Sequence, residues 1–273
     1  MKDQRGIALV IVLWGVSLLS LLAASLAAGS GMAARRSLNT VQAAQARARL
    51  DEALAATALA LERPQRPWRA DGRPRHLALD GAEAEVRVQD ERGRADLNHA
   101  APPLLQALLR RAAGDTDAAD RLQAALTARV TQRPLLTVAE LAALPGVDAR
   151  LYRRLSPLVT VHNPGGKVDW RLADPALLTA IPGLTEAQAA ALVARRGDSG
   201  YSPDPAMTDA MNRAGVAALS DQGPIGDLRL VTVRISLSLS GGGRASAEIL
   251  VKLAADGDPL RIVEWRSPVG DGA

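Results

Sequence analysis

The chain has 273 residues and a formal net charge of +4, from 33 basic and 29 acidic side chains. It contains no cysteine, so its fold uses neither disulfides nor thiolate metal sites. Phe is absent and aromatic residues make up 2% of the chain, so the core must be built from aliphatic side chains. The arginines are spread along the sequence, whereas a nucleic-acid patch requires basic residues clustered on one face.

The N-terminal part contains an uninterrupted uncharged run. No charged side chain occurs in residues 7–34, and the core of the run covers residues 7–28. At about 1.5 Å per residue, a helix of that length spans about 33 Å, which is enough to cross the hydrocarbon core of a bilayer. A short polar segment, residues 1–6, precedes it. We therefore expect a transmembrane helix over residues 7–29.

Three interpretations of this segment compete. A secretory signal peptide would be cut at the small residues around 23–28, but its apolar core normally has only about 7–15 residues. A plain membrane anchor is the second, although Arg35 beyond the run weakens the orientation that the leader charges favour. The third rests on the junction Arg5-Gly6-Ile7, which resembles the processing site of type IV prepilins and pseudopilins. We favour this third interpretation.

The resemblance implies that a prepilin peptidase cuts between Gly6 and Ile7, removes the leader and N-methylates Ile7. Most members of these families carry Glu at the fifth mature position, which is Ile11 here. A carboxylate inside a bilayer is costly and is kept only for a function, which in these families is thought to be pairing with the amine of the subunit ahead. A subunit with Ile11 can be followed by another but cannot follow one. The pseudopilins that lack this Glu are the protein K family of the type II secretion system (general secretion pathway protein K).

An amphipathic helix is expected beyond the apolar run. Leu50, Leu54, Ala58 and Leu61 recur at helical spacing on one face, and two prolines then end the helix. Residues 68–82 are rich in Arg, Pro, Asp and Gly, and we predict that they form a loop. An apolar half that inserts and an amphipathic half that docks on a sheet are typical of the pilin helix.

Period-two alternation predicts four strands. The first covers residues 82–89, and the others cover 228–239, 245–253 and 260–266. Alternation with one apolar face means that one face of the sheet is covered. The helix over residues 33–61 is the available cover. We therefore expect the four strands to share one antiparallel sheet, with a helical region inserted between the first strand and the rest.

The segment Val88–Asn98 resembles a protein K signature of the form Asp-x-x-Gly-x-x-Asn-Leu-Asn. Asp96 stands where the family more often has Asn. A turn over residues 90–93, followed by Asn98 as the cap of a helix that contains Pro102 in its first turn, explains these residues without an active site.

The pattern is helical from Pro102 to about Gly215. It contains a weak repeat, residues 140–155 and 176–193, in which a short helix, a Pro-Gly turn and a second helix follow one another. This is the helix-hairpin-helix layout. Residues 136–161 also resemble the central block of the protein K family.

The helix-hairpin-helix layout supplies the alternative function, a membrane-anchored DNA-binding or DNA-uptake protein. DNA-binding versions offer backbone N–H groups of a Gly-apolar-Gly turn to phosphate. Asp148 and Thr185 stand where the second Gly is expected, and the Asp148 carboxylate would repel phosphate. We therefore favour a packing module or a protein-contact surface, and expect no nucleic-acid partner.

The sequence offers no convincing catalytic group. Gly197-Asp-Ser-Gly200 matches the nucleophile motif of chymotrypsin-like proteases, but Ser199 follows a predicted helix. The three histidines (His76, His99 and His162) have no partner at a recognisable spacing. There is no phosphate-binding loop or zinc-binding helix. We predict that the chain is not an enzyme.

A calcium ion is a candidate ligand. Asp198, Asp204 and Asp209 lie in a Gly/Ser/Pro-containing loop of the kind that can wrap this ion with oxygen ligands. Members of the protein K family are thought to bind calcium in the inserted domain, although none of their ligands can be aligned onto this chain. A solvated acidic loop is the simpler interpretation.

The predicted fold class is α+β and pilin-like. A long N-terminal transmembrane and amphipathic helix packs on an antiparallel sheet, with a large inserted all-α domain of helix-hairpin-helix (SAM-like) repeats. The expected boundaries are a leader over residues 1–6, a transmembrane helix over 7–29, a pilin-like α/β domain over 30–96 and 224–273, and the inserted domain over 97–223.

The resemblance implies a minor pseudopilin of the type II secretion system. It would sit at the tip of the periplasmic pseudopilus with other minor pseudopilins, and would help to start or limit its assembly for export of folded proteins across the outer membrane. Further partners would be the major pseudopilin, the prepilin peptidase and the inner-membrane assembly platform. The expected location is the bacterial inner membrane, with a single membrane pass and the globular part in the periplasm.

Overall fold

The computed structural model describes the backbone of residues 4–62, 68–181, 184–195, 229–240, 242–253 and 261–266, with the single residues Asp209, Asn212 and Leu219. In the first helix, side chains are described for residues 12–22 and from Thr40 onward. The chain forms two compact units, Met1–Glu52 and Ala53–Ala273.

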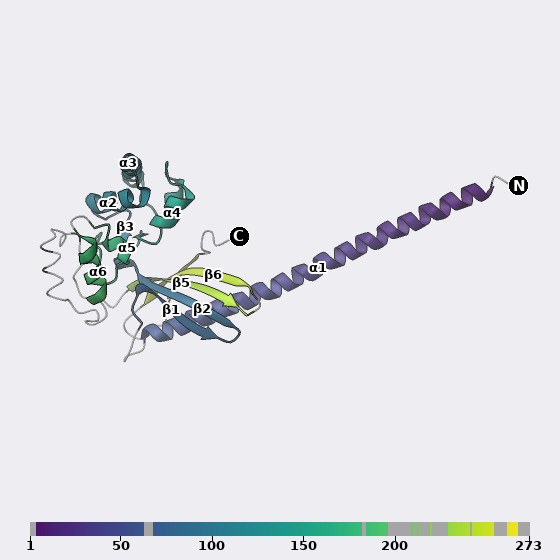
Figure 1. Cartoon of the computed structure of the whole chain (residues 1–273), viewed down its shortest axis with the longest axis horizontal. Coiled ribbons are helices and arrows are strands. Elements are labelled where there is room, and N and C mark those ends of the chain that lie inside the picture. The colour runs from purple at the N-terminus through teal and green to yellow at the C-terminus, as the bar shows by residue number, and fades with distance from the viewer. Residues whose placement is uncertain are drawn as a thin grey trace. The chain divides into compact units, whose positions relative to one another are not determined.

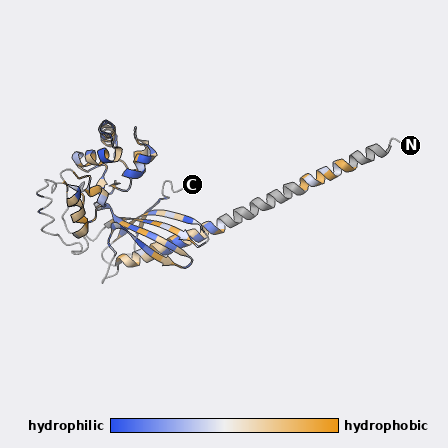
Figure 2. Cartoon of the chain, viewed as in Figure 1, coloured by the Kyte–Doolittle hydropathy of each residue, from blue (hydrophilic) through white to orange (hydrophobic). Residues whose placement is uncertain are grey.

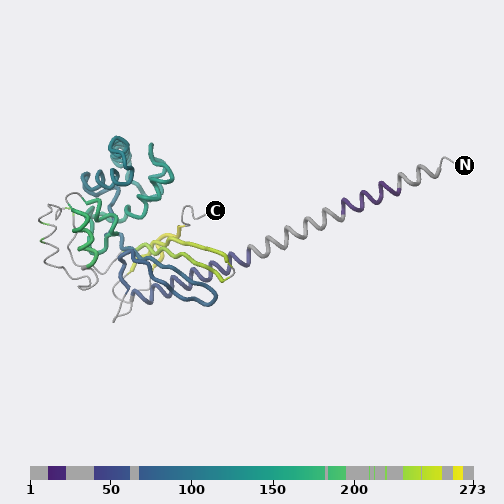
Figure 3. Tube along the Cα trace, viewed as in Figure 1, coloured from purple at the N-terminus to yellow at the C-terminus, as the bar shows by residue number. Residues whose placement is uncertain are grey.

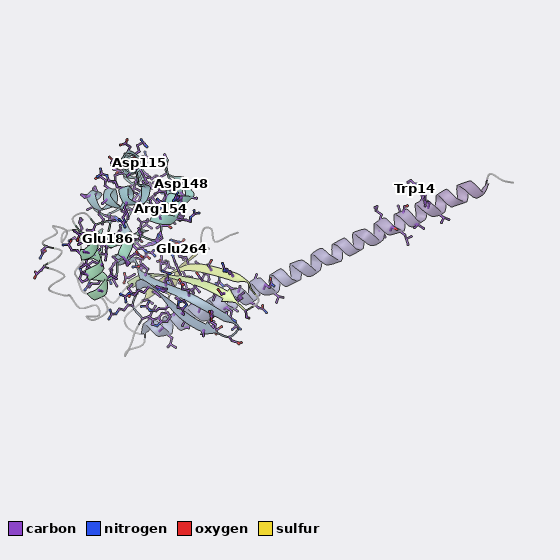
Figure 4. The ribbon with its side chains drawn as sticks, in the orientation of Figure 1. Trp14, Asp115, Asp148, Arg154, Glu186 and Glu264 are labelled. Atoms are coloured by element: carbon purple, nitrogen blue, oxygen red, sulfur yellow. The ribbon has the colours of Figure 1, made fainter. Side chains whose placement is uncertain are left out.

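The first helix, α1 (Gln4–Glu62), is continuous over both predicted helical segments. In the part of α1 that belongs to the first unit, the apolar side chains of residues 12–22 are exposed. Trp14, for example, is 72% exposed (Figure 4). Among the residues that the structure describes, no helix is both long enough and apolar enough to cross a membrane.

The second unit contains a five-stranded antiparallel sheet in the order β1-β2-β5-β6-β7. Its strands are β1 (Asp71–Leu79), β2 (Ala82–Asp90), β5 (Arg229–Leu239), β6 (Arg244–Leu253) and β7 (Arg261–Arg266). Strands from before and after the helical region therefore lie side by side, as the blue and yellow-green traces in Figure 3 show. This confirms the strands predicted at 82–89 and 228–266 and their common sheet.

One face of this sheet is apolar and the other is polar. Val86 of β2 is in register with Ile235 of β5, which is in register with Ala247 of β6, and all three are buried. The next residues along the strands, Arg87 and Arg234, share the opposite face with further charged side chains. Hydropathy accordingly alternates along each strand (Figure 2).

The last turns of α1 present a buried stripe to this unit. Ala53, Leu54, Ala60 and Leu61 are at most 8% exposed, and they recur at helical spacing. Thr57 is also buried in the stripe, because its hydroxyl donates to the carbonyl of Ala53 at 2.7 Å and is thereby satisfied. The end of α1 runs alongside the sheet (Figure 1), so we infer that the stripe covers the apolar face.

The predicted loop over residues 68–82 is wrong in its central part, because Asp71–Leu79 forms strand β1. This strand pairs with β2 alone and lies at the edge of the sheet. An edge position tolerates Pro74, which has no N–H to donate, and the register shifts between Asp71 and Pro74. Proline, glycine and arginine hid the half-buried alternation of Arg75, Leu77 and Leu79 from the sequence pattern.

Helices fill the chain between β2 and β5, as predicted for the part that the structure describes. They are α2 (Pro102–Ala113), α3 (Thr116–Gln132), α4 (Ala149–Leu155), α5 (Pro175–Leu178) and α6 (Glu186–Arg195), with 3-10 turns η1 (Glu91–Gly93) and η2 (Val138–Ala143). Two short strands, β3 (Ala95–Asp96) and β4 (Val159–Thr160), form a separate parallel pair that the sequence did not predict.

The helical region has its own aliphatic core. Leu104, Leu108, Leu126, Leu141 and Leu155 are among its fully buried side chains. Leucine and alanine dominate this core, as expected for a chain without phenylalanine. The helical region and the sheet belong to the same compact unit.

Candidate functional site

The signature segment Val88–Asn98 lies where β2 leaves the sheet and enters the helical region. Asp90 begins its turn, because its carboxylate accepts a hydrogen bond from the backbone N–H of Arg92 at 3.0 Å. Gly93 has no room for a side chain, since a Cβ there would lie 2.5 Å from the carbonyl oxygen of Leu172. The predicted turn over residues 90–93 is confirmed as η1.

Glu91 is the centre of a buried polar cluster in this turn. It is 2% exposed, and its carboxylate accepts from Arg94 Nη1 at 3.1 Å and from the hydroxyl of Thr232 at 2.6 Å. The hydroxyl of Thr160 also donates to it. Because Thr232 belongs to β5 and Thr160 to β4, this one carboxylate connects the sheet with the helical region.

The residues at the end of the signature also have a structural role. The buried carboxylate of Asp96 accepts backbone hydrogen bonds from Asn98 at 2.8 Å, His99 at 3.0 Å and Asn163 at 2.8 Å. A side chain at this position must therefore accept several hydrogen bonds at once, and a carboxylate does so. The imidazole Nδ1 of His99 lies 3.0 Å from the same carboxylate.

The prediction that Asn98 caps the next helix is wrong. The helix α2 begins at Pro102, and its cap position is Ala101, which has no side-chain hydrogen bond to offer. Asn98 instead bonds the backbone of Leu135 twice, accepting from its N–H at 2.8 Å and donating to its carbonyl at 3.0 Å. The side chain of Asn98 therefore makes a long-range contact, although the local sequence pattern indicated a helix cap.

A cavity of about 310 Å³ lies on the polar face of the sheet. Its lining consists of Gly72, Glu85, Arg87, Gln89, Arg94, Pro157, Asp174, Thr232, Arg234 and Ser236. Burial lowers the pKa of Arg94 in spite of the opposing attraction of Glu91. Sequence reasoning missed this cavity because its arginines lie far apart in the chain and share no local motif. Arg87 belongs to β2, Arg94 directly follows η1 and Arg234 belongs to β5.

The hairpins of the helical region carry side-chain caps where a nucleic-acid phosphate would bind. Asp148, at the start of α4 (Figure 4), accepts from the backbone N–H of Leu151 at 2.6 Å. Thr185, before α6, accepts from the backbone N–H of Gln188 at 3.2 Å. Each cap occupies one of the backbone donors that a phosphate at that helix N-terminus would use, which weakens the case for DNA binding there.

The structure describes only some of the other predicted site residues. Gly6, Ile7 and Ile11 lie on the backbone of α1, and their side chains are outside the described residues. Of the candidate calcium loop, Asp198 and Asp204 lie outside the described residues, as does Ser199. Asp209 is described and exposed. Among the described side chains, no group of His, Cys, Asp and Glu is placed to hold a metal ion.

The fold places the chain in the mixed helix and antiparallel-sheet class, with a long N-terminal helix and a helical region between the second and third strands of the large sheet. Among solved structures, a chain from the crystal structure of the GspK-GspI-GspJ complex, from the type 2 secretion system of enterotoxigenic Escherichia coli, has a similar fold. The TM-score is 0.58 at 16% identity, over 86% of this chain and 100% of that chain. No protein-family model and no curated protein matches the sequence.

Proposed function

We propose that the chain is a minor pseudopilin of the type II secretion system, similar to protein K. The observation that carries the proposal is the fold, which is similar to a chain of the GspK-GspI-GspJ complex over 86% of this chain and the whole of that one. The residues of the protein K signature add support, because they form the turn and buried cluster that join the sheet to the helices. In this proposal the chain is an assembly subunit and catalyses no reaction.

The N-terminal residues give the proposed mode of membrane attachment. A prepilin peptidase would cut between Gly6 and Ile7 and methylate Ile7, leaving residues 7–29 to anchor the subunit in the inner membrane before assembly. The globular part would then lie in the periplasm, as a pilin-like domain (30–96 and 224–273) with an inserted domain (97–223).

The proposed place in the filament is the tip. Ile11 offers no carboxylate to the amine of a subunit ahead, while the amine of Ile7 can still pair with a subunit behind. The partners are therefore other minor pseudopilins, as in the complex that contains the similar chain, and the major pseudopilin beneath them. The helical region between β2 and β5 adds bulk that would hinder stacking above it.

Intact-mass analysis of the chain purified from membranes tests this proposal. We expect loss of residues 1–6 and the added mass of one methyl group. Gly6→Leu should block this processing. Gly15→Leu is the matched control, because it changes a glycine of the same helix that has nothing within 4 Å of its Cβ position. Loss of about thirty residues would instead identify a signal peptide and overturn the proposal.

Calcium binding in the inserted region is a separate proposal. Asp198, Asp204 and Asp209 would supply carboxylate oxygens, which are the ligands that calcium prefers. Calorimetric titration of the purified chain with calcium tests it, with Asp204→Asn expected to weaken binding. A titration without saturable heat would refute the site and leave the pseudopilin proposal unaffected.

A further inference from the structure

The cavity on the polar face of the sheet is built by both parts of the second unit. Its floor comes from β2 and β5, and Pro157 and Asp174 of the helical region add to its lining. Its volume, about 310 Å³, is at the lower end of the range for small-molecule sites, which is roughly 300–1,000 Å³. The cavity is therefore large enough for a small polar ligand.

Three arginines line this cavity, and a carboxylate orients each of them. Arg87 Nε donates to Glu85 at 2.9 Å, Arg94 Nη1 donates to Glu91 at 3.1 Å, and Arg234 Nε donates to Glu248 at 2.6 Å. A guanidinium has five N–H donors in a fixed plane, so one carboxylate oxygen holds it in place without using all of its donors.

Arg94 is the most buried of the three arginines. Its side chain is 5% exposed, and its Nε is buried with no hydrogen-bond partner in the described part of the chain. Because this atom has almost no accessible surface, a ligand in the cavity could not reach it, and its unmet hydrogen bond is a cost within the turn. The hydroxyl of Ser236 adds one more donor to the lining, whereas the hydroxyl of Thr232 already donates to Glu91.

The two acids in the lining are already engaged. Glu85 accepts from Arg87, and Asp174 accepts from the backbone N–H of Ala176 at 2.8 Å, where it caps α5. Glu91 and Glu248, just outside the lining, pair with Arg94 and Arg234 in the same way, so the charge of each guanidinium is balanced by a carboxylate. What the cavity offers a ligand is therefore the guanidinium N–H donors that these carboxylates leave unused.

We propose that this cavity binds a small oxyanion, the carboxylate or phosphate group of a free small molecule. Arg87, Arg94 and Arg234 donate hydrogen bonds to its oxygens, since planar guanidinium groups match the geometry of both groups. Glu85, Glu91 and Glu248 hold the three guanidinium groups in place before the ligand arrives. This site does not depend on the pseudopilin proposal.

Isothermal titration calorimetry of the purified full-length chain at low ionic strength tests the site. Inorganic phosphate and citrate are titrated separately, so that the two sources of the oxyanion are distinguished. We expect saturable binding of at least one of them with one ligand per chain. Arg87→Gln and Arg234→Gln should each raise the Kd of the bound anion at least about tenfold, which is the change in affinity expected when one charge-assisted hydrogen bond is lost.

Arg111→Gln is the matched control, because Arg111 is an exposed arginine of α2 that is not part of the cavity lining. It should bind as the wild type does. The Arg87 side chain is 48% exposed, so its replacement should leave the fold intact, and circular dichroism checks this. The proposal is wrong if neither anion gives saturable heat, or if folded Arg87→Gln and Arg234→Gln chains bind as tightly as the wild type.

Discussion

Gly93 shows how a single residue determines the junction between the sheet and the helices. Its Cα approaches the backbone so closely that an added Cβ would lie 2.5 Å from Leu172 O and 2.5 Å from Gln89 Nε2. The same amide group of Gln89 donates to Leu172 O at 2.7 Å. Gly93 is therefore required by close packing, since its backbone is not in the left-handed region.

We expect Gly93→Ala to lower the free energy of unfolding by about 1–3 kcal/mol, the usual cost of overpacking a buried site. Urea denaturation of the purified chain measures this. Gly165→Ala is the control, because a Cβ there meets only Asn163 Oδ1 at 3.7 Å. It should change stability by less than about 1 kcal/mol. Equal effects of the two substitutions would contradict the packing argument.

Glu140 makes the stability of the helical region sensitive to acid. Its carboxylate accepts from the backbone N–H groups of Leu136 at 2.7 Å and Thr137 at 3.1 Å, and from Arg129 at 2.6 Å. The hydrogen bond from the Leu136 N–H is the largest cause that lowers the pKa of Glu140. The hydrogen bond from Thr137 and the positive charge of Arg129 lower this pKa further. A lowered folded-state pKa means that the unfolded chain binds the proton more readily.

The stabilisation by Glu140 is therefore present above pH 4.5, the ordinary pKa of the group, and is lost as the pH falls through the lower folded-state value. We expect Glu140→Gln to lose less of its free energy of unfolding than the wild type between about pH 5 and pH 3. Denaturation curves at several pH values measure the two slopes. Parallel slopes would show that the carboxylate does not titrate as described.

At the scale of elements, the alternating strands were the predictable part of the fold. In β2, β5 and β6 every second side chain faces a covered layer, so burial imposes the pattern on the sequence. Strand β1 escaped prediction because it lies at the edge, where Pro74 and the exposed Arg73 are tolerated. Edge strands experience less of the packing that makes a strand recognisable.

The buried pair Glu91 and Arg94 ties these elements together. Removing one partner of a buried pair leaves the other charge uncompensated, which usually costs about 3–5 kcal/mol. We expect Glu91→Leu to destabilise the chain by about this amount, because Arg94 is 4% exposed. The double variant Glu91→Leu/Arg94→Met should recover much of the loss. Urea denaturation of both variants measures the difference.

If the double variant were as unstable as Glu91→Leu alone, the loss would come from the hydroxyl contacts of Glu91. Those contacts are with Thr160 and Thr232, which no apolar replacement can satisfy. The comparison therefore separates the cost of an unpaired charge from the loss of the connection between β4 and β5.

At the scale of the whole molecule, sequence reasoning could order the chain into helix, strand, helical region and strands, because each part has its own periodicity. It could not find the arginine-lined cavity, since Arg87 and Arg234 meet only after strands from opposite sides of the helical region pair. It also could not assign Asn98, whose partner Leu135 lies 37 residues away. Contacts between distant segments leave no local signal.

The proposed tip position gives the last prediction. If Ile11 prevents the subunit from following another, an epitope on this protein should label one end of isolated pseudopili, whatever their length. Ile11→Glu restores a carboxylate that can pair with the amine of a subunit ahead, so some of the label should then appear within the fibres. Immunogold counting along fibres from wild-type and variant cells measures both positions.

Two results would contradict different parts of this explanation. Label within wild-type fibres would contradict the tip position itself. Label that stays at the end in the Ile11→Glu variant would show that the missing carboxylate is not what limits stacking. The bulk of the helical region between β2 and β5 would then be the limiting feature, because it belongs to the same compact unit as the sheet and would occupy the space above the subunit.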